Sequence, residues 1–208
     1  MTQESENSGL TYSQEIAEQL RGDILSGRIA EGGRLTEQEL AKRFGVGRSP
    51  VREAVLRLSM QGLLASRPNR GAIISPGAPL EIRKLVVPIR RTVESFALET
   101  VFDSLTEEDF QKWEEIVQRM KQACEEGDLY AIAELDIAFH RTLVERTRQP
   151  DLLVIWDALV GRIRSHFRRM QRSNGESNEI YQEHKAILEC FRKGSLEEAK
   201  RMLRAKID

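Results

Sequence analysis

The sequence has few of the residues that indicate a secreted, membrane-bound or disulfide-stabilised protein. Only two of its 208 residues are cysteine, Cys124 and Cys190, and they have no C-x-x-C spacing. We therefore expect reduced thiols rather than a disulfide or a metal clip. No run approaches the roughly 20 apolar residues that a membrane span needs, and the polar residues 1–9 lack the apolar core of a signal peptide. These absences predict a cytoplasmic protein without a membrane partner.

A strong net charge is also lacking. The formal charge of -1 excludes a non-specific polycation, so any binding to nucleic acid must come from a local patch. Residues 42–75 supply such a patch, because they contain seven Lys or Arg residues and a single acid, Glu53. An apolar fraction of 40% and a charged fraction of 31% are typical of a helix-rich globular protein.

The pattern in and before the basic segment predicts a helix-turn-helix. Thr36 and Glu39 form a capping box that begins a short helix, and Gly45 lies beyond its end. A second helix is expected over residues 48–61. Pro50 is tolerated there because it falls in the first turn, where its missing N–H has no intrahelical partner.

Further elements on both sides complete a winged helix-turn-helix. Helical spacing begins at Ser13, which we expect to be the N-cap, and Gly27 ends this first helix. After the helix-turn-helix, residues 63–66 and 72–75 read as two short strands around a turn. Three helices and a β-hairpin wing are therefore predicted.

Residues 75–79 form the only cluster of proline and glycine, which indicates a domain boundary. We divide the chain into a disordered start, a winged helix-turn-helix domain, a linker and an all-α domain, over residues 1–10, 11–75, 76–79 and 80–208. The last domain shows only helical spacing, and its helices are expected near residues 80–103, 106–126, 128–147, 150–172, 177–193 and 195–207. The predicted fold class is mainly α, with a bundle of about six helices after the winged domain.

Short motifs in both domains resemble one known family. The string Phe44-Gly45-Val46-Gly47-Arg48-Ser49-Pro50-Val51-Arg52 resembles the DNA-binding domain of the GntR family of bacterial transcription regulators. The helical remainder resembles the FCD ligand-binding domain of the FadR branch. Its landmarks are Arg90 with Glu94, Asp136 with His140, Glu183-His184, and Gly194-Ser195-Leu196. The resemblance implies a ligand-responsive repressor that binds a palindromic double-stranded DNA operator as a homodimer.

The arginines of the second helix of the helix-turn-helix are the first candidates for DNA contact. Arg48 and Arg52 lie four residues apart on one face, where a guanidinium can bond a guanine edge or a phosphate. Ser49 and the N–H groups of the first turn suit a phosphate. Arg57 is expected to meet the DNA backbone, and Arg70 the minor groove.

The resemblance implies DNA contacts for the positions of Arg48, Ser49, Arg52 and Gly71. Gly47 stands where the family usually has Ser or Thr, so a helix cap is missing. Gln38 stands where some relatives carry Arg, and it either reads a base or has no role. The predicted DNA-binding residues are Gln38, Arg48, Ser49, Pro50, Arg52, Arg57, Arg70 and Gly71.

A metal site is one of two interpretations of the second domain. Asp136 and His140 lie four residues apart on one helix face, which is metal-ligand spacing, and His184 on a later helix can join them. The resemblance implies a third histidine, but that position is Lys206. Either Asp136, His140 and His184 hold Zn²⁺ or Ni²⁺, or Asp136 pairs with Lys206 in place of the metal.

A cationic pocket for an effector is also predicted. Arg90 forms an ordinary i,i+4 pair with Glu94 or, as the resemblance implies, faces the pocket. The arginine-rich helix near residue 165 adds cations, of which Arg162 and its neighbour His166 are favoured. The predicted effector-binding residues are Arg90, Arg162, His166 and Lys206. A cationic pocket implies a small carboxylate as the effector.

Two other functions stay open on the sequence. The histidines and Asp136 suit a metal-dependent hydrolytic enzyme with an appended DNA-binding domain, although no nucleophile–base motif accompanies them and we predict no catalytic residue. The lysine at position 206 instead suits a DNA-binding protein whose effector domain no longer senses a ligand.

Overall fold

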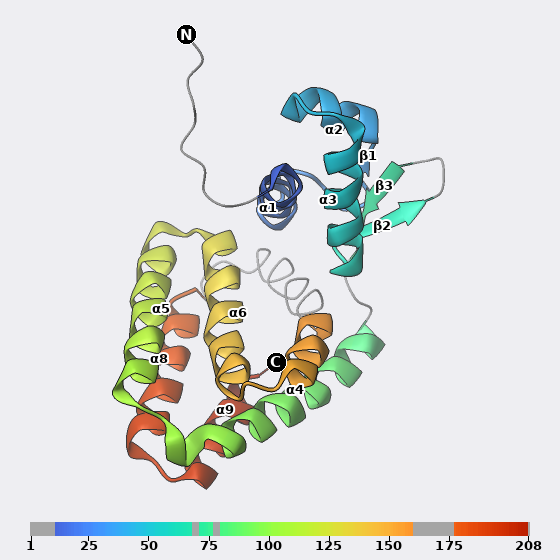
Figure 1. Ribbon diagram of the computed structural model, residues 1–208. Helices are drawn as coiled ribbons and strands as arrows, with labels where there is room; N and C mark the ends of the chain where they lie inside the picture. The colour runs from blue at the N-terminus through green and yellow to red at the C-terminus, as the bar shows by residue number, and fades with distance from the viewer. Residues whose placement is uncertain (1–10, 68–70, 77–79, 160–176, 208) are drawn as a thin grey trace. The chain divides into compact units, whose positions relative to one another are not determined.

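The computed structural model describes residues 11–67, 71–76, 80–159 and 177–207, and the chain divides into two compact units between Gly77 and Ala78 (Figure 1). The predicted disordered start and most of the predicted linker lie outside the described residues. Among the helices that are described, none is long and apolar enough to cross a membrane.

The first unit contains three helices and a small antiparallel sheet (Figure 1). The helices are α1 (Tyr12–Leu25), α2 (Glu37–Phe44) and α3 (Arg48–Met60). The strands β1 (Arg34–Leu35), β2 (Leu64–Arg67) and β3 (Gly71–Ile74) lie in the order β1-β3-β2. This arrangement is a winged helix-turn-helix, as the sequence predicted.

The start of α1 differs from the prediction. The N-cap is Thr11, whose side chain accepts from the backbone N–H of Gln14, while the Gln14 side chain accepts from the N–H of Thr11. Ser13 is buried inside the helix, with its hydroxyl 3.0 Å from that of Thr11. Thr11 is the better cap because the reciprocal pair with Gln14 satisfies two backbone donors at once.

The junction of α2 and α3 follows the predicted capping pattern. Thr36 Oγ1 accepts from the N–H of Glu39 at 3.2 Å, and Glu39 Oε2 accepts from the N–H of Thr36 at 3.0 Å. Gly45 ends α2 with a left-handed φ of 66°, which permits the tight turn. Gly47 caps α3 without a side-chain hydrogen bond, so the first N–H groups of α3 remain suited to an external acceptor.

Strand β1 is an element that the sequence did not predict, because two residues are too short to show a strand period. Arg34 pairs with Ile73, and Leu35 pairs with Ala72. Gly71 has a φ of 77°, and a Cβ atom at this position would lie 2.4 Å from the carbonyl oxygen of Leu35. Only glycine therefore lets β1 approach the wing this closely.

The second unit is entirely helical in its described residues. Its helices are α4 (Leu80–Val101), α5 (Glu107–Glu126), α6 (Leu129–Arg146), α8 (Ser177–Lys193) and α9 (Leu196–Lys206), with a 3₁₀ turn at Phe102–Ser104 and a further helical segment at 150–159. The predicted helix at 80–103 thus ends as a 3₁₀ turn. Pro88 lies inside α4, and the helical backbone continues on both sides of it. The predicted helix at 150–172 leaves the described residues at position 160.

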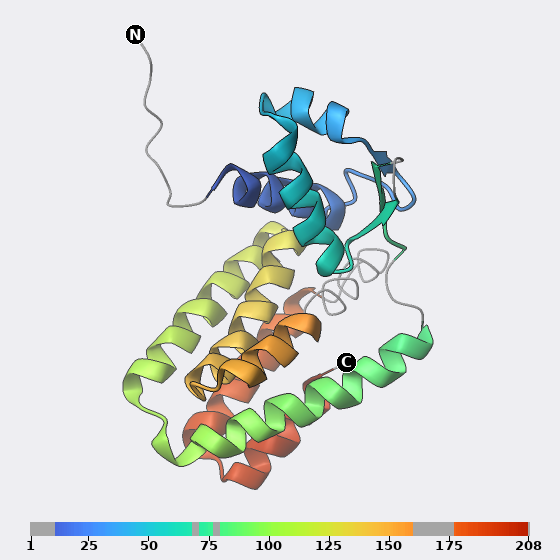
Figure 2. The ribbon, with the colours of Figure 1, turned by 45° about the vertical axis from the view of Figure 1, so that its right-hand side comes forward.

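Helices α5, α6 and α8 lie side by side, and α4 packs against α6 and α9 (Figures 1 and 2). Trp113 of α5 is fully buried at the centre of this core. Its Nε1 donates to the carbonyl oxygen of Phe139 at 3.0 Å, and its ring meets Phe191 edge-on at 5.5 Å. The indole thus fixes α6 and α8 against α5 while its single polar group is satisfied.

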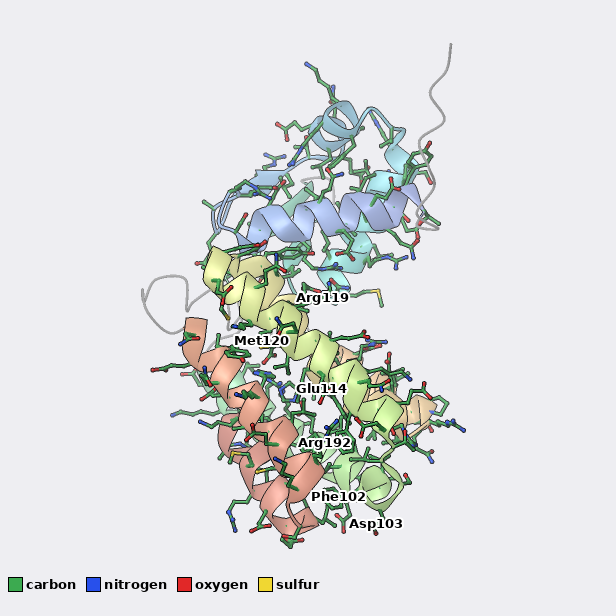
Figure 3. All side chains as sticks on the ribbon, turned by 90° about the vertical axis from the view of Figure 1, so that its left-hand side faces the viewer. Phe102, Asp103, Glu114, Arg119, Met120 and Arg192 are labelled. Carbon is green, nitrogen blue, oxygen red and sulfur yellow. The ribbon has the colours of Figure 1, made fainter. Side chains whose placement is uncertain are left out.

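A charged contact on the outer side of α5 and α8 reinforces this packing (Figure 3). Arg192 Nη2 of α8 lies 2.9 Å from Glu107 Oε1 and 3.0 Å from Glu114 Oε1 of α5. Its guanidinium also covers the ring of Phe110, 4.7 Å from the ring centroid. Buried aromatic contacts and exposed ion pairs therefore both hold α8 against α5.

Candidate functional site

The first candidate site is the exposed face of the helix-turn-helix. Helix α3 buries Val51 and Leu58 in the core of its unit, while Arg48, Ser49 and Arg52 remain exposed at its N-terminal half. We call the exposed residues Gln38, Arg48, Ser49 and Arg52, together with half-buried Pro50, the recognition surface. It combines a helix N-terminus with two guanidinium groups.

Arg52 is held by a contact that the sequence did not predict. Its Nε lies 3.1 Å from Glu37 Oε1, and its Nη2 lies 3.0 Å from Glu37 Oε2. The hydrogen bonds from Arg52 lower the pKa of Glu37, and Glu37 raises the pKa of Arg52, so both groups are charged at neutral pH. The alternation of acids and bases in α2 and α3 gave no sign of this cross-helix pair.

The other predicted DNA-binding residues lie at different places. Arg57 is half-buried one turn beyond Glu53, to which it donates at 3.3 Å. Gly71 begins β3 in the wing. Arg70 lies outside the described residues.

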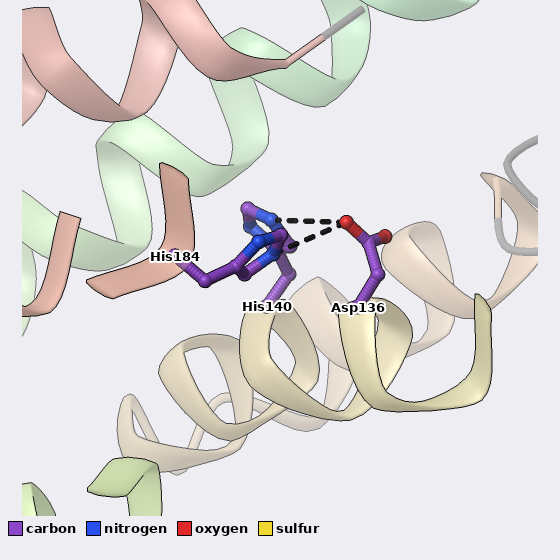
Figure 4. Close-up of side chains that lie close together, drawn as sticks. All are labelled: Asp136, His140 and His184. Atoms are coloured by element: carbon purple, nitrogen blue, oxygen red, sulfur yellow. Dashed lines mark ion pairs between the residues drawn. The ribbon is translucent and has the colours of Figure 1, made fainter. Parts of the chain in front are cut away.

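The second candidate site is a buried cluster in the second unit (Figure 4). Asp136 and His140 come from successive turns of α6, and His184 comes from α8. Asp136 Oδ1 lies 3.2 Å from His184 Nε2 and 3.8 Å from His140 Nε2. One ligand atom from each of the three residues lies within 4.8 Å of the other two, and all three residues are buried. The structure therefore brings together the three side chains of the predicted metal site.

Glu94 of α4 organises one side of this cluster. Its carboxylate accepts from Arg90 Nε at 2.7 Å, His140 Nδ1 at 2.6 Å and Trp156 Nε1 at 3.2 Å. Burial alone would raise the pKa of Glu94, but the charge of Arg90 and the contact with His140 outweigh it and lower the pKa to about 2. Glu94 is therefore an ionised acceptor for three donors.

The hydrogen bonds of both histidines direct their Nε2 atoms toward Asp136. His184 Nδ1 lies 2.8 Å from the carbonyl oxygen of Ile180, which can only accept, so Nδ1 carries the proton. His140 Nδ1 donates in the same way to ionised Glu94. Burial lowers the pKa of His140, which favours its neutral ring. A neutral ring that is protonated at Nδ1 has a lone pair at Nε2, and this is the form that binds metals.

The charges of the cluster are not balanced by the residues that compose it. Burial opposes ionisation of Asp136, but the charge of Arg90 and the contact with His184 outweigh it and lower its pKa. With both carboxylates ionised, Arg90 offsets one of two negative charges, and its Nη2 lies 3.6 Å from Asp136 Oδ2. Among the described residues, His184 Nε2 and Asp136 Oδ2 are buried and find no hydrogen-bond partner. A divalent cation fits this arrangement, because it would add positive charge between the carboxylate and the Nε2 lone pairs.

Lys206 does not take the position that the sequence suggested. Its Nζ lies 2.9 Å from Glu183 Oε1, and the lysine is exposed on the last turn of α9. The contact of Lys206 with an effector stays a prediction, but the Asp136–Lys206 pair, the alternative to a metal site, is not formed. The reason is that Glu183 lies beside His184 on the solvent side of α8 and offers a hydrated partner. Arg90 provides the cation next to Asp136 instead.

The remaining effector-binding predictions have different outcomes. Arg90 is buried and forms the i,i+4 pair with Glu94, and its Nη2 lies 3.6 Å from Asp136 Oδ2, while its contact with an effector stays a prediction. Arg162 and His166 lie outside the described residues. The hydrogen bond from Trp156 to Glu94 was not predicted, because the sequence pattern does not reveal the partner of an indole N–H.

Comparisons with known proteins agree with both units. Residues 12–74 match the model of the bacterial regulatory proteins of the gntR family, and residues 86–208 match the FCD domain. The HTH-type transcriptional repressor RspR of Escherichia coli is 32% identical over 160 residues, which are 76% of this chain and 68% of RspR. A probable D-xylose utilization operon transcriptional repressor of Paenarthrobacter nicotinovorans is 28% identical over 197 residues, 93% of this chain and 84% of that protein.

A solved structure shows the same fold over nearly the whole chain. The structure of E. coli McbR/YncC aligns with a TM-score of 0.78 at 22% identity and covers 95% of this chain and 93% of the McbR chain. The matching families consist of transcription regulators, so the hydrolytic-enzyme interpretation is not supported. The chain therefore belongs to the GntR family of bacterial transcription regulators and carries an FCD domain as its second unit.

Proposed function

We propose that this DNA-binding regulator is a repressor that binds a palindromic operator as a homodimer and responds to a small carboxylate. The observation that carries the proposal is the recognition surface, in which exposed Arg48 and Arg52 flank the free N-terminus of α3. Several relatives are named repressors, which supports that direction of regulation.

The recognition surface divides into base and phosphate contacts. Arg48 and Arg52 lie one turn apart, at the end of the helix that enters the major groove first in this fold, and they are assigned to base edges. Ser49, Pro50 and the N–H groups of the first turn of α3 are assigned to a phosphate. Gln38 on the first turn of α2 is assigned to the same groove.

Arg57, Arg70 and Gly71 are assigned to the edges of the interface. Arg57 is half-buried behind the recognition surface and reaches the DNA backbone. Gly71 at the start of β3, and Arg70 by its place in the sequence, are assigned to the minor groove, as in proteins that insert an arginine there.

Binding to DNA selected from a random duplex pool tests this assignment. Arg48→Ala and Arg52→Ala should each weaken binding to the selected duplex about 5- to 100-fold and relax the base preference. Lys121→Ala, an exposed cation of the second unit, is the control. Unchanged affinity in both arginine variants would contradict the assignment.

An apolar stripe on α4 supports the homodimer. Ile82, Leu85, Ile89 and Phe96 are exposed, although α4 also has a buried face. Successive gaps of 3, 4 and 7 residues place them on one side of the helix, as at a helix–helix seam. Because a two-fold axis pairs one surface with its own copy, a single stripe forms a complete interface with a second chain.

Sedimentation of the full chain tests the dimer. Leu85→Glu and Phe96→Glu should each convert the dimer to a monomer at micromolar concentration, because each buries a charge in the seam. Met60→Glu, at an exposed apolar residue of α3, is the matched control. A wild-type protein that sediments as a monomer, or variants that remain dimers, would count against this interface.

The buried cluster is the proposed sensor. Asp136, His140 and His184 would hold a Zn²⁺ or Ni²⁺ ion, for which two imidazoles and a carboxylate are ordinary ligands. Such an ion would supply positive charge beside that of Arg90, which suits the binding of a carboxylate. Glu94 orients His140 and Arg90 through its hydrogen bonds, so α4, α6 and α8 all contribute to one site.

Titration with Zn²⁺ and Ni²⁺ after chelator treatment tests the sensor. Asp136→Asn should weaken metal binding at least tenfold, because it removes the charged ligand. Lys206→Ala should leave metal affinity unchanged, because Lys206 pairs with Glu183. If neither the wild type nor the lysine variant binds metal, and acetate and succinate do not bind either, the proposed metal-assisted carboxylate sensor is contradicted.

A further inference from the structure

The pairing of Glu37 with Arg52 is a feature that DNA binding alone does not require. Glu37 is the first residue of α2, and Arg52 lies on the second turn of α3. The two hydrogen bonds of 3.1 and 3.0 Å run in parallel from one side of the guanidinium to both carboxylate oxygens. This bidentate geometry fixes the plane of the guanidinium, which a single contact does not.

The guanidinium has a second edge that the glutamate leaves available. Glu37 accepts from Nε and Nη2, which form the side edge of the group. The end edge consists of Nη1–H and the other Nη2–H, and these two donors are also parallel. Guanine presents O6 and N7 as two adjacent acceptors in the major groove, which match this end edge. One arginine can therefore bind Glu37 and a guanine together.

The charge of the pair also distinguishes a base contact from a phosphate contact. Hydrogen bonding to Arg52 lowers the pKa of Glu37, so the carboxylate is ionised where DNA would approach. The net charge of the pair is zero, and Glu37 repels phosphate oxygens that come close. The pair therefore adds little to sequence-independent attraction, which depends on uncompensated Lys and Arg charges.

We propose that Glu37 is a positioning residue that makes Arg52 a reader of guanine and suppresses its use as a phosphate clamp. This inference rests on the proposed contact between Arg52 and DNA. Glu37 raises specificity in two ways: it orients the end edge of Arg52 toward a base, and it weakens binding to DNA that offers only phosphates.

A second pair on the same helix provides a matched control. Glu53 and Arg57 lie four residues apart on α3, with both side chains about half exposed, and Arg57 Nη2 donates to Glu53 Oε1 at 3.3 Å. Glu53→Gln removes the same charge from the same unit as Glu37→Gln. It does not release Arg52, so a general electrostatic effect appears in both variants and a positioning effect in only one.

The experiment measures a ratio of affinities in the full-length protein. A duplex is selected from a random pool by the wild type, and its Kd is compared with that of a scrambled duplex of the same composition at one salt concentration. Glu37→Gln and Glu37→Ala should lower the specificity ratio about tenfold, partly through tighter binding of the scrambled duplex. Glu53→Gln should leave the ratio within about twofold of the wild type.

A double variant and a modified base test whether Glu37 acts through Arg52. In the Arg52→Ala background, Glu37→Ala should cause no further loss of the ratio. Replacing guanine by 7-deazaguanine at one selected position should weaken wild-type binding about tenfold and have little effect on Glu37→Ala, because N7 is one of the two acceptors. Thermal unfolding of the variants checks the fold, and the cap of α2 does not depend on Glu37, since Thr36 pairs with Glu39.

The outcomes separate this inference from the assignment of Arg52 itself. If Arg52→Ala leaves the specificity ratio unchanged, the proposed base contact of Arg52 is overturned. If Arg52→Ala lowers the specificity ratio but Glu37→Ala leaves it unchanged, only the positioning role of Glu37 is overturned. Equal losses in Glu37→Gln and Glu53→Gln would show a general charge effect and would also overturn the positioning role.

Discussion

In the first unit Arg52 pairs with Glu37 at the surface, whereas in the second unit Arg90 pairs with Glu94 in the core. The arginine side chain is 70% exposed in the surface pair and 6% exposed in the buried pair. Water and salt screen the surface pair, so a competing ligand can replace either partner at small cost. Water does not compete for the buried pair, and loss of Glu94 deprives Arg90 Nε of an acceptor at 2.7 Å in the core.

The buried glutamate also has more hydrogen-bond donors than the exposed one. Glu37 accepts from one arginine, while Glu94 accepts from Arg90, His140 and Trp156 on three different helical segments. An exposed pair therefore suits a surface that has to exchange contacts with DNA. A buried glutamate with three donors suits a site whose histidine must keep one orientation.

The largest expected effect comes from breaking the buried pair. Glu94→Ala removes the acceptor of three buried donors, on Arg90, His140 and Trp156, so we expect a loss of about 3–5 kcal/mol in the unfolding free energy of the second unit. Both tryptophans, Trp113 and Trp156, lie in this unit, so urea unfolding followed by tryptophan fluorescence reports it.

The control for this prediction is Glu37→Ala, which breaks the surface pair in the other unit. It should leave the fluorescence transition of the second unit unchanged. A Glu94→Ala protein with wild-type stability would show that water enters the cluster and solvates Arg90, and the contrast between the two pairs would then fail.

The fold of both units could be predicted because it depends on helix caps, turn residues and helical spacing, which are visible in short stretches of sequence. The capping box at Thr36 and the glycine at position 45 determine where α2 begins and ends, and the structure has them as expected. Asp136 and His140 were predicted to share a face because a helix repeats about every four residues, and the structure places them together.

The errors concern contacts between segments that are far apart in the sequence. Strand β1 forms only because β3 offers it a partner, and two residues carry no period of their own. The position of Lys206 in the family motif suggested that it could lie beside Asp136. Instead, its Nζ forms an ion pair with Glu183. Nothing in the spacing of α2 and α3 predicted the Glu37–Arg52 pair. Such pairings depend on tertiary geometry, which a single sequence does not display.

A metal ion bound at the buried cluster should raise the unfolding free energy of the second unit. At a free Zn²⁺ or Ni²⁺ concentration of about 100 times its Kd, the wild type should gain about 2.7 kcal/mol in unfolding free energy of the second unit. Asp136→Asn should lose most of this gain, while Arg52→Ala should retain it. A gain of equal size in Asp136→Asn would place the ion at a different site.

Asp23 in the first unit provides an intermediate case and a pH test. This aspartate is nearly buried and accepts from Arg28 at 2.7 Å and from Arg43, whose side chains are partly exposed. Burial alone would raise the pKa of Asp23, but the hydrogen bonds from Arg43 and Arg28 outweigh it, so the folded pKa lies below 3.8. Its contribution to stability is therefore complete above about pH 3.8 and decreases as the pH falls through the folded pKa.

Asp23→Asn should remove this contribution, which solvent screening keeps at or below about 1 kcal/mol. Hydrogen exchange of α1 amides at pH 5 and pH 3 measures it, and the difference between wild type and variant should shrink at the lower pH. Asp103→Asn, at an exposed aspartate in the second unit, is the control. A difference that grows on acidification would mean that the folded pKa of Asp23 is raised instead.

The smallest expected effect belongs to the Glu53–Arg57 pair, which is exposed and lies within one helix. Pairs of this spacing contribute about 0.3–0.5 kcal/mol and are screened by salt, because both side chains keep most of their hydration. Glu53→Gln should therefore lower the unfolding free energy of the first unit by no more than this, and the difference should vanish in about 1 M salt, where the screening length is about 3 Å. Hydrogen exchange of α3 amides at low and high salt measures both values. A salt-independent loss larger than about 1 kcal/mol would show that Glu53 has a partner other than Arg57, and the variant would then no longer serve as the control for Glu37.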